Sequence, residues 1–143
     1  MTIVTFYSLT TGSRGDRLLL ACRLVERILA QHLRILIYCP EPQQAEQLNR
    51  LLWTFRQDSF LPHGLVGTVD PTLTPVLISV NGDPETEQQV LINLSSVIPS
   101  FVDRFARVCE VIDLDPVQRD AGRDRFRVYR ERGYVLEHHL LQL

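Results

Sequence analysis

The residues from 119 to 132 carry the most concentrated chemistry in the chain, because six of its fifteen cationic side chains fall there and all fifteen are arginine. Guanidinium groups pair with carboxylate or phosphate oxygens in a bidentate manner. At 100° per residue, one helix face carries four arginines and an aromatic ring: Arg119, Arg123, Phe126, Arg127 and Arg130. This arginine stripe predicts a surface for an anionic, partly apolar ligand. The alternative is an ordinary solvated helix face.

Outside this stretch, the chain carries a net negative charge. The 143 residues have a net charge of −2, and the stretch from 119 to 132 holds six arginines against three acids, a local +3 that leaves −5 elsewhere. Such a distribution disfavours wrapping of a long nucleic acid and suits a compact anionic partner. With 45% apolar residues, the chain is long enough for one domain, residues 1–143, that needs no metal or disulfide.

The cysteines and the apolar runs bear on the cellular compartment. Cys22, Cys39 and Cys109 are far apart in apolar surroundings, which predicts reduced thiols in the core. No apolar run approaches the length of a membrane span, and the first residues lack a basic, signal-like start. We therefore expect a cytoplasmic protein without membrane association.

The first half of the chain alternates strand and helix patterns. Residues 3–8 have strand character, and residues 17–33 have apolar side chains at helical spacing. A continuous apolar run over 34–39 is typical of a strand covered on both faces, and the prolines that follow it open a second helix over 40–55. This order predicts a βαβ start with parallel pairing.

The second half is less regular until the arginine stripe. Residues 57–74 predict mostly loop, with a short strand near Leu65. Residues 76–80 and 90–94 predict two strands that could pair as a hairpin with a long loop. After these we expect a short helix capped by Ser100, a strand over 107–113, and the arginine helix from Pro116 to a stop at Gly133.

Catalytic and cofactor motifs are missing from the sequence. The loop after the first strand has neither phosphate-binding glycine pattern, and a chain without lysine cannot supply a phosphate-loop lysine. The adjacent His138 and His139 are expected to be exposed on a short tail, without metal-ligand spacing to other histidines or cysteines. No nucleophile elbow occurs, and carboxylates such as Glu110 and Asp113 are scattered. We therefore expect no catalytic set, no cofactor and no metal.

Two large aromatic residues, Trp53 and Phe60, stand just before and inside the predicted loop. Aromatic residues in such positions are either core residues or interface anchors. Composition alone favours the core.

Three stretches give the chain a resemblance to a known family. They are Thr5-Phe6-Tyr7 in the first strand, Leu52-Trp53 followed at fixed spacing by the segment from Ser59 to Leu65, and the segment from Arg123 to Tyr134. In these residues, and along nearly its whole length, the chain resembles the chi-subunit family of the bacterial DNA polymerase III holoenzyme.

The resemblance implies a single α/β domain with a mixed, mostly parallel sheet flanked by helices, similar to nucleotide-binding folds but without a phosphate loop. It also implies that the protein is an accessory subunit without catalytic activity. The basic helix would bind the acidic C-terminal tail of single-stranded DNA-binding protein through the positions that match the family pattern, Arg119, Arg123, Phe126 and Arg127.

A second surface is implied by the same resemblance. Trp53 and Phe60 would dock the psi subunit of the clamp loader or a helicase-like alternative partner, which favours an interface role for these rings over a core role. The chain departs from the family where tyrosine is familiar at Phe126 and lysine at Arg119 and Arg127. Arginine in place of lysine keeps the positive charge but presents a planar fork of donors in place of a single ammonium group.

Two other functions stay open on the residues alone. One is a direct single-stranded nucleic-acid binder that uses the arginines and aromatic ring of the last helix. The other is a nucleotide-dependent enzyme. If the chain functions as the chi-subunit family does, we expect no stable direct binding to nucleic acid.

Overall fold

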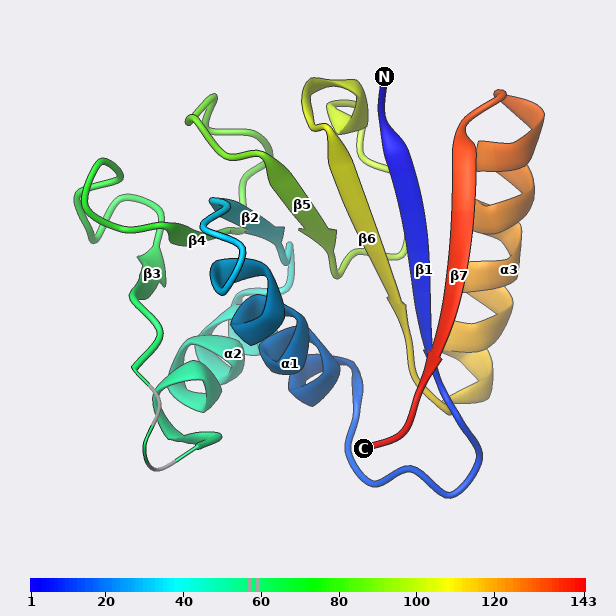
Figure 1. Ribbon diagram of the computed structural model, residues 1–143, viewed down its shortest axis with the longest axis horizontal. Coiled ribbons are helices and arrows are strands. Elements are labelled where there is room, and N and C mark those ends of the chain that lie inside the picture. The colour runs from blue at the N-terminus through cyan, green and yellow to red at the C-terminus, as the bar shows by residue number, and fades with distance from the viewer. Residues whose placement is uncertain (57, 59) are drawn as a thin grey trace.

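Alternating strands and helices build one parallel sheet (Figure 1). The computed structural model describes residues 1–56, 58 and 60–143; Gln57, in the predicted loop, and Ser59, in the second stretch of resemblance, lie outside the described residues. The elements are β1 (Ile3–Leu9), α1 (Arg17–Leu29), β2 (Ile35–Tyr38), α2 (Pro42–Thr54), β3 (His63–Leu65), β4 (Val76–Ser79), β5 (Val90–Asn93), the 3-10 helix η1 (Val102–Arg104), β6 (Arg107–Ile112), α3 (Pro116–Glu131) and β7 (Val135–Leu141).

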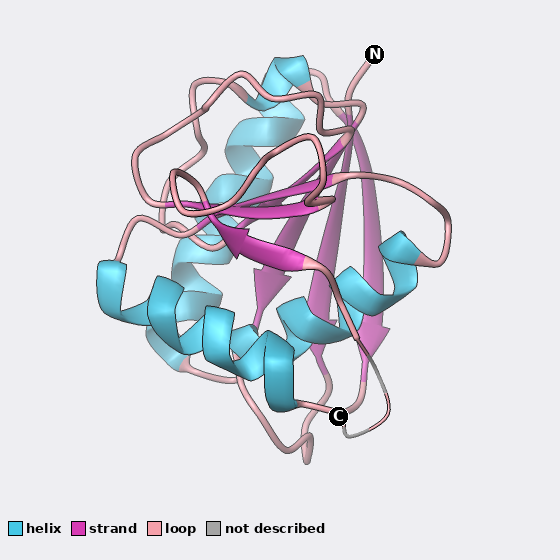
Figure 2. Ribbon diagram, turned by 90° about the vertical axis from the view of Figure 1, so that its left-hand side faces the viewer, coloured by secondary structure: helices cyan, strands magenta, loops and turns pink. Residues whose placement is uncertain are grey.

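The sheet has the strand order β3-β4-β2-β5-β6-β1-β7, and all of its pairings in the described chain are parallel. Helices α1 and α2 lie on one face of the sheet and α3 lies on the other (Figures 1 and 2). Both faces of the central strands are therefore buried. The predicted fold class, an α/β domain with helices flanking the sheet, is confirmed, but the sheet expected to be mixed and mostly parallel is parallel throughout the described residues.

The alternation of side chains along each central strand divides the core in two. In β2, Ile35 and Ile37 join the apolar cluster under α1 and α2, whereas Leu36 joins the cluster under α3. The second cluster also holds Phe6 and the fully buried Tyr129 of α3. Burial on both faces explains why the sequence of β2 is a continuous apolar run.

The ends of α3 are fixed by local chemistry. The Asp115 carboxylate accepts a hydrogen bond from the Gln118 amide at 3.2 Å, and Pro116 occupies the first turn. Both features favour the start of a helix. After the helix, Gly133 adopts φ of +83°, a left-handed conformation that glycine tolerates without strain. The chain reverses there and enters β7.

Two predictions about the middle of the chain are wrong. β4 and β5 do not form a hairpin, because each pairs in parallel with β2, which lies between them. Ser100 does not cap a helix: the helical turn is η1, its cap position is Phe101, and no side chain caps it. The predicted short strand near Leu65 is confirmed as β3.

The C-terminal residues form an element that the sequence pattern did not indicate. Residues predicted as a short tail form β7, a seven-residue strand that pairs with β1 along its whole length and makes one edge of the sheet. Its side chains are mostly exposed, so β7 lacks the apolar run that marks a central strand. The tail interpretation of His138 and His139 is therefore wrong, although both side chains are exposed.

The three cysteines are buried and free, as predicted. Burial raises the pKa of the Cys22 and Cys109 thiols to about 12, which keeps both protonated and unreactive at neutral pH. Within the described residues, no helix has the length and apolar character needed to cross a bilayer.

Candidate anion-binding groove

A groove of about 340 Å³ runs between the first half of α3 and the ends of β1 and β7. Its apolar floor is built from both sides. From the strands come Phe6, Leu9, Ile112 and Leu140, and from α3 come Gly122 and Phe126. Polar and charged side chains rim this floor: Ser8, Asp113, Arg119, Arg123 and His138.

Close packing of α3 on the sheet shapes the floor. A Cβ atom on Gly122 would lie 2.2 Å from Ile112 Cδ1, so the helix approaches β6 closely here and a larger residue would require the end of the Ile112 side chain to shift. One turn further on, the Phe126 ring meets Phe6 edge-on, with ring centroids 5.1 Å apart. Phe126 is therefore partly buried against β1 while its remaining surface lines the groove.

The arginines of the rim are open to solvent. The Arg123 side chain is 74% exposed, and its contact with Asp120 is long, at 3.6 Å. Exposed ion pairs of this kind contribute about 0.3 to 0.5 kcal/mol on a helix. Arg123 can therefore give up its weak contact with Asp120 and pair with an incoming anion.

The structure brings together three of the four predicted tail-contacting residues. Arg119, Arg123 and Phe126 line the same groove. Arg127 lies further along α3, where its guanidinium approaches Asp124 at 3.9 Å and Glu131 at 3.5 Å. The Arg127 side chain is 54% exposed, but it is not among the described residues that line the groove.

Arg125 belongs to the arginine cluster but turns inward. Its Nε donates to Glu110 Oε1 at 2.9 Å, and the two side chains are 5% and 0% exposed. Glu110 Oε2 also accepts from the Tyr129 hydroxyl at 2.8 Å and from Asn93 Nδ2 at 2.9 Å. Arg125 further donates to the Ser96 carbonyl oxygen at 3.1 Å. This buried network joins α3 to β6, β5 and the loop after β5.

The network fixes which face of α3 is exposed. Burial raises the pKa of Glu110, and the Arg125 guanidinium and the hydrogen bonds from Asn93 and Tyr129 oppose that rise by stabilising the carboxylate. With Gly122, Arg125 and Tyr129 held against the sheet, Arg119 and Arg123 must face the groove side. The inward-facing residues are three and four positions apart, the spacing of one helix face.

This network is not among the features expected from the sequence, in which Glu110 is only one of several scattered carboxylates. A signal was available, because an acid in the middle of an apolar strand needs a buried partner. Arg125, flanked at helical spacing by Gly122 and Tyr129, was the matching candidate.

Trp53 and Phe60 form a second exposed feature, here called the aromatic patch. Their side chains are 50% and 69% exposed, and the ring centroids lie 5.5 Å apart. Trp53 also rests on the buried His63 ring at 4.6 Å, and His63 Nε2 lies 2.9 Å from the Asn49 carbonyl oxygen. The core position that composition favoured is therefore wrong for both aromatics.

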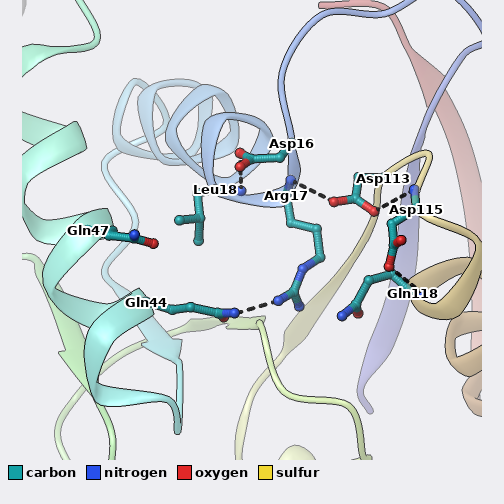
Figure 3. A pocket seen from close by; sticks show the side chains of 8 residues that line it. All are labelled: Asp16, Arg17, Leu18, Gln44, Gln47, Asp113, Asp115 and Gln118. Atoms are coloured by element: carbon teal, nitrogen blue, oxygen red, sulfur yellow. Dashed lines mark hydrogen bonds between the residues drawn. The ribbon is translucent and has the colours of Figure 1, made fainter.

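The place where doubly wound folds bind nucleotides holds a small polar cavity (Figure 3). Arg17, only 9% exposed, extends into it and donates to Gln44 Oε1 at 3.1 Å and to the Leu94 carbonyl oxygen at 2.9 Å. The carboxylates of Asp16 and Asp113 accept hydrogen bonds from backbone amides around it. Acidic groups at these helix starts disfavour phosphate, because they occupy the amides that would bind it.

The fold and the groove together define a class of protein. It is an α/β domain of nucleotide-binding architecture in which the usual ligand site is a polar cavity lined by Arg17 and by acidic side chains. Its open cationic groove lies elsewhere, on α3.

Comparison with known proteins gives the family. A family model described as DNA polymerase III chi subunit, HolC, matches residues 1–137, and the chain belongs to this family. It is 38% identical to DNA polymerase III subunit chi of Pseudomonas aeruginosa over 141 residues, covering 99% of this chain and 98% of that one. The subunits chi of Haemophilus influenzae and Escherichia coli are 30% and 29% identical, each over 92% of this chain and over 92% and 93% of their own lengths.

Solved structures of low sequence identity share the fold alone. The structure of T4 UvsW aligns with a TM-score of 0.64 at 13% identity, covering 97% of this chain and 41% of that chain. Mss116p DEAD-box helicase domain 2, solved bound to an RNA duplex, aligns with a TM-score of 0.56 at 10% identity, covering 97% of this chain and 64% of that chain. The resemblance to nucleotide-binding architecture is thus confirmed at the level of fold.

Family membership also decides between the broad functions. The chain is an accessory subunit of the DNA polymerase III holoenzyme, acts in DNA replication and is not itself an enzyme. The nucleotide-dependent-enzyme alternative is therefore wrong.

Proposed function

We propose that the groove on α3 binds the acidic C-terminal tail of single-stranded DNA-binding protein, and that the aromatic patch links this chain to the clamp loader through the psi subunit. The observation that carries the first half is the placement of Arg119 and Arg123 above an apolar floor, open to solvent. An acidic peptide end with an apolar side chain matches both features.

The binding mode follows from the positions of the charged groups. The terminal carboxylate and adjacent acidic side chains of the tail pair with Arg123, helped by Arg119 and, at the margin, by Arg127. An apolar tail residue rests against Phe126 and the floor of the groove. Arginine forks favour bidentate contacts with such carboxylates.

The expected affinity is moderate. Each charge-assisted hydrogen bond contributes about 1.5 to 3 kcal/mol, but ordering a flexible tail costs about 2 to 5 kcal/mol. A dissociation constant of about 1 μM, equivalent to about −8 kcal/mol, is the natural scale.

The two surfaces lie near opposite edges of the sheet, which supports the proposal that both partners bind at once. The groove includes residues of β7, at one edge of the sheet, and the aromatic patch stands beside β3, at the other edge. A subunit that links two proteins needs such separation. A helicase-like protein is the alternative partner for the patch.

A titration of the purified chain separates tail binding from direct nucleic-acid binding. We expect an acidic C-terminal peptide to bind with a dissociation constant of about 1 μM, and a single-stranded oligonucleotide to bind far more weakly. Peptide binding should weaken at high ionic strength, because the contacts are exposed ion pairs. Tight binding of the oligonucleotide with no peptide binding would instead support the direct nucleic-acid binder.

A substitution at the aromatic patch tests the second link. Trp53→Ala is expected to weaken binding of the psi subunit by about 1 kcal/mol or more, roughly fivefold, because exposed tryptophan is a frequent interface anchor. Binding of the tail peptide should stay unchanged. Leu73→Ala, at a 77% exposed apolar residue outside the patch, is the matched control in a pull-down or calorimetric assay. Equal psi binding by wild type and Trp53→Ala would remove the patch from the proposal.

A further inference from the structure

The wall of the groove opposite α3 carries one ionisable side chain from β7, His138. In the sheet register, His138 lies beside Phe6, and its Nε2 is 2.9 Å from the Ser8 hydroxyl oxygen. The side chain is exposed, as are those of Arg119 and Arg123 across the groove. The imidazole is thus held by Ser8 at one nitrogen, with its other nitrogen on the ring edge away from that contact.

We propose that His138 is a specificity-determining residue for the acidic peptide, and that its protonation tightens binding. This inference rests on the proposed function of the groove. The protonated ring donates Nε2–H to Ser8 and presents Nδ1–H and a positive charge to the peptide. An acidic tail is then contacted from both walls, by guanidinium groups from α3 and by imidazolium from β7.

The charges around His138 make its protonation matter to the ligand. Histidine is the side chain whose charge ordinarily changes between about pH 5 and 8. Across the groove stand Arg119 and Arg123 from α3, and at the end of β6 stands Asp113, the one carboxylate among the described residues that line the groove. The Asp113 carboxylate already accepts hydrogen bonds from the backbone amides of Arg17 and Asp115, at 3.3 and 3.1 Å. An acidic peptide is therefore the strongest anionic partner that a protonated His138 can gain.

The next residue on the strand provides a matched control. His139 points to the opposite face of the sheet, as strand alternation requires, and stacks on Tyr7 with ring centroids 5.5 Å apart. Its neighbour Glu137 faces the same side and accepts a hydrogen bond from Thr5 at 3.2 Å. Both histidines are exposed residues of one edge strand, but only His138 lines the groove.

The test is calorimetric titration of an N-acetylated acidic peptide into the full chain at pH 6 and pH 8. The wild type and His139→Gln are expected to bind about two- to fivefold more tightly at pH 6, the range of one exposed ion pair. His138→Gln should bind equally at both pH values, with its pH 8 affinity close to that of the wild type. At pH 6, His138→Arg should bind at least as tightly as the wild type. Its affinity at pH 8 should equal its own affinity at pH 6, because arginine keeps its charge at both pH values.

The outcomes separate this inference from the proposed function. A pH dependence that survives in full in His138→Gln, or a wild type that binds equally at both pH values, would overturn the role of His138 and leave the groove as the peptide site. Absence of peptide binding by the wild type and His138→Arg at either pH would overturn the proposed function itself.

Discussion

Arg123→Ala is expected to weaken binding of the acidic tail peptide by about 10- to 100-fold, the equivalent of one charge-assisted contact of about 1.5 to 3 kcal/mol. Arg123 lines the groove, is 74% exposed on its side chain, and has only a long contact with Asp120. Its removal takes away a ligand contact without opening the core. Isothermal titration calorimetry measures the loss, and circular dichroism checks that the fold is kept.

The matched control for this prediction removes the same charge from the same region. Arg132 is exposed at the C-cap of α3 and lines a different hollow, beside Gly133 and Tyr134. Arg132→Ala should change peptide affinity by less than about threefold, as a general loss of field strength would. If both variants lost affinity equally, binding would depend on the overall positive field and not on the groove.

Glu110→Ala is expected to lower the free energy of unfolding by about 3 to 5 kcal/mol. The substitution leaves the Arg125 guanidinium, 5% exposed, without its carboxylate, and removes the acceptor of the Tyr129 hydroxyl. An uncompensated buried charge accounts for most of the loss. Urea unfolding followed by circular dichroism measures it.

Two further variants show whether the buried pair is the cause. Asp124→Ala removes an exposed carboxylate of α3, 77% exposed on its side chain, and should change stability by less than about 0.5 kcal/mol. The double variant Glu110→Leu with Arg125→Met should recover part of the loss, because it removes both charges together. An unfolding midpoint of Glu110→Ala equal to that of the wild type would contradict the assigned role of the network.

Much of the fold could be predicted from the sequence because local patterns and tertiary environment agree there. The continuous apolar run of β2 reflects burial on both faces, and the periodicity of α1 reflects its packing on one face. The arginine stripe was also predictable, since helical spacing depends only on local geometry. Helical spacing alone places Arg119, Arg123 and Phe126 on one face, and all three line one groove in the structure.

The features that could not be predicted depend on contacts between distant parts of the chain. β7 is an exposed edge strand, so its sequence has no apolar run, and its pairing with β1 spans most of the chain. Likewise, Arg125 is an arginine among six; its helical spacing from Gly122 and Tyr129 indicates the inward face of α3, but its ion pair depends on the position of Glu110 on the facing strand. His138 lines the groove only because β7 pairs with β1, so its position there could not be predicted either.

The most direct measurement of the central claim is a nuclear magnetic resonance titration of the ¹⁵N-labelled chain with the acidic tail peptide. Binding in the groove predicts that the largest amide shift changes occur in α3 between Arg119 and Phe126 and in the facing residues of β1 and β7, from Phe6 to Leu9 and from His138 to Leu140. Saturable binding with its largest changes around the aromatic patch, or at the polar cavity beside Arg17, would contradict the assignment of the groove.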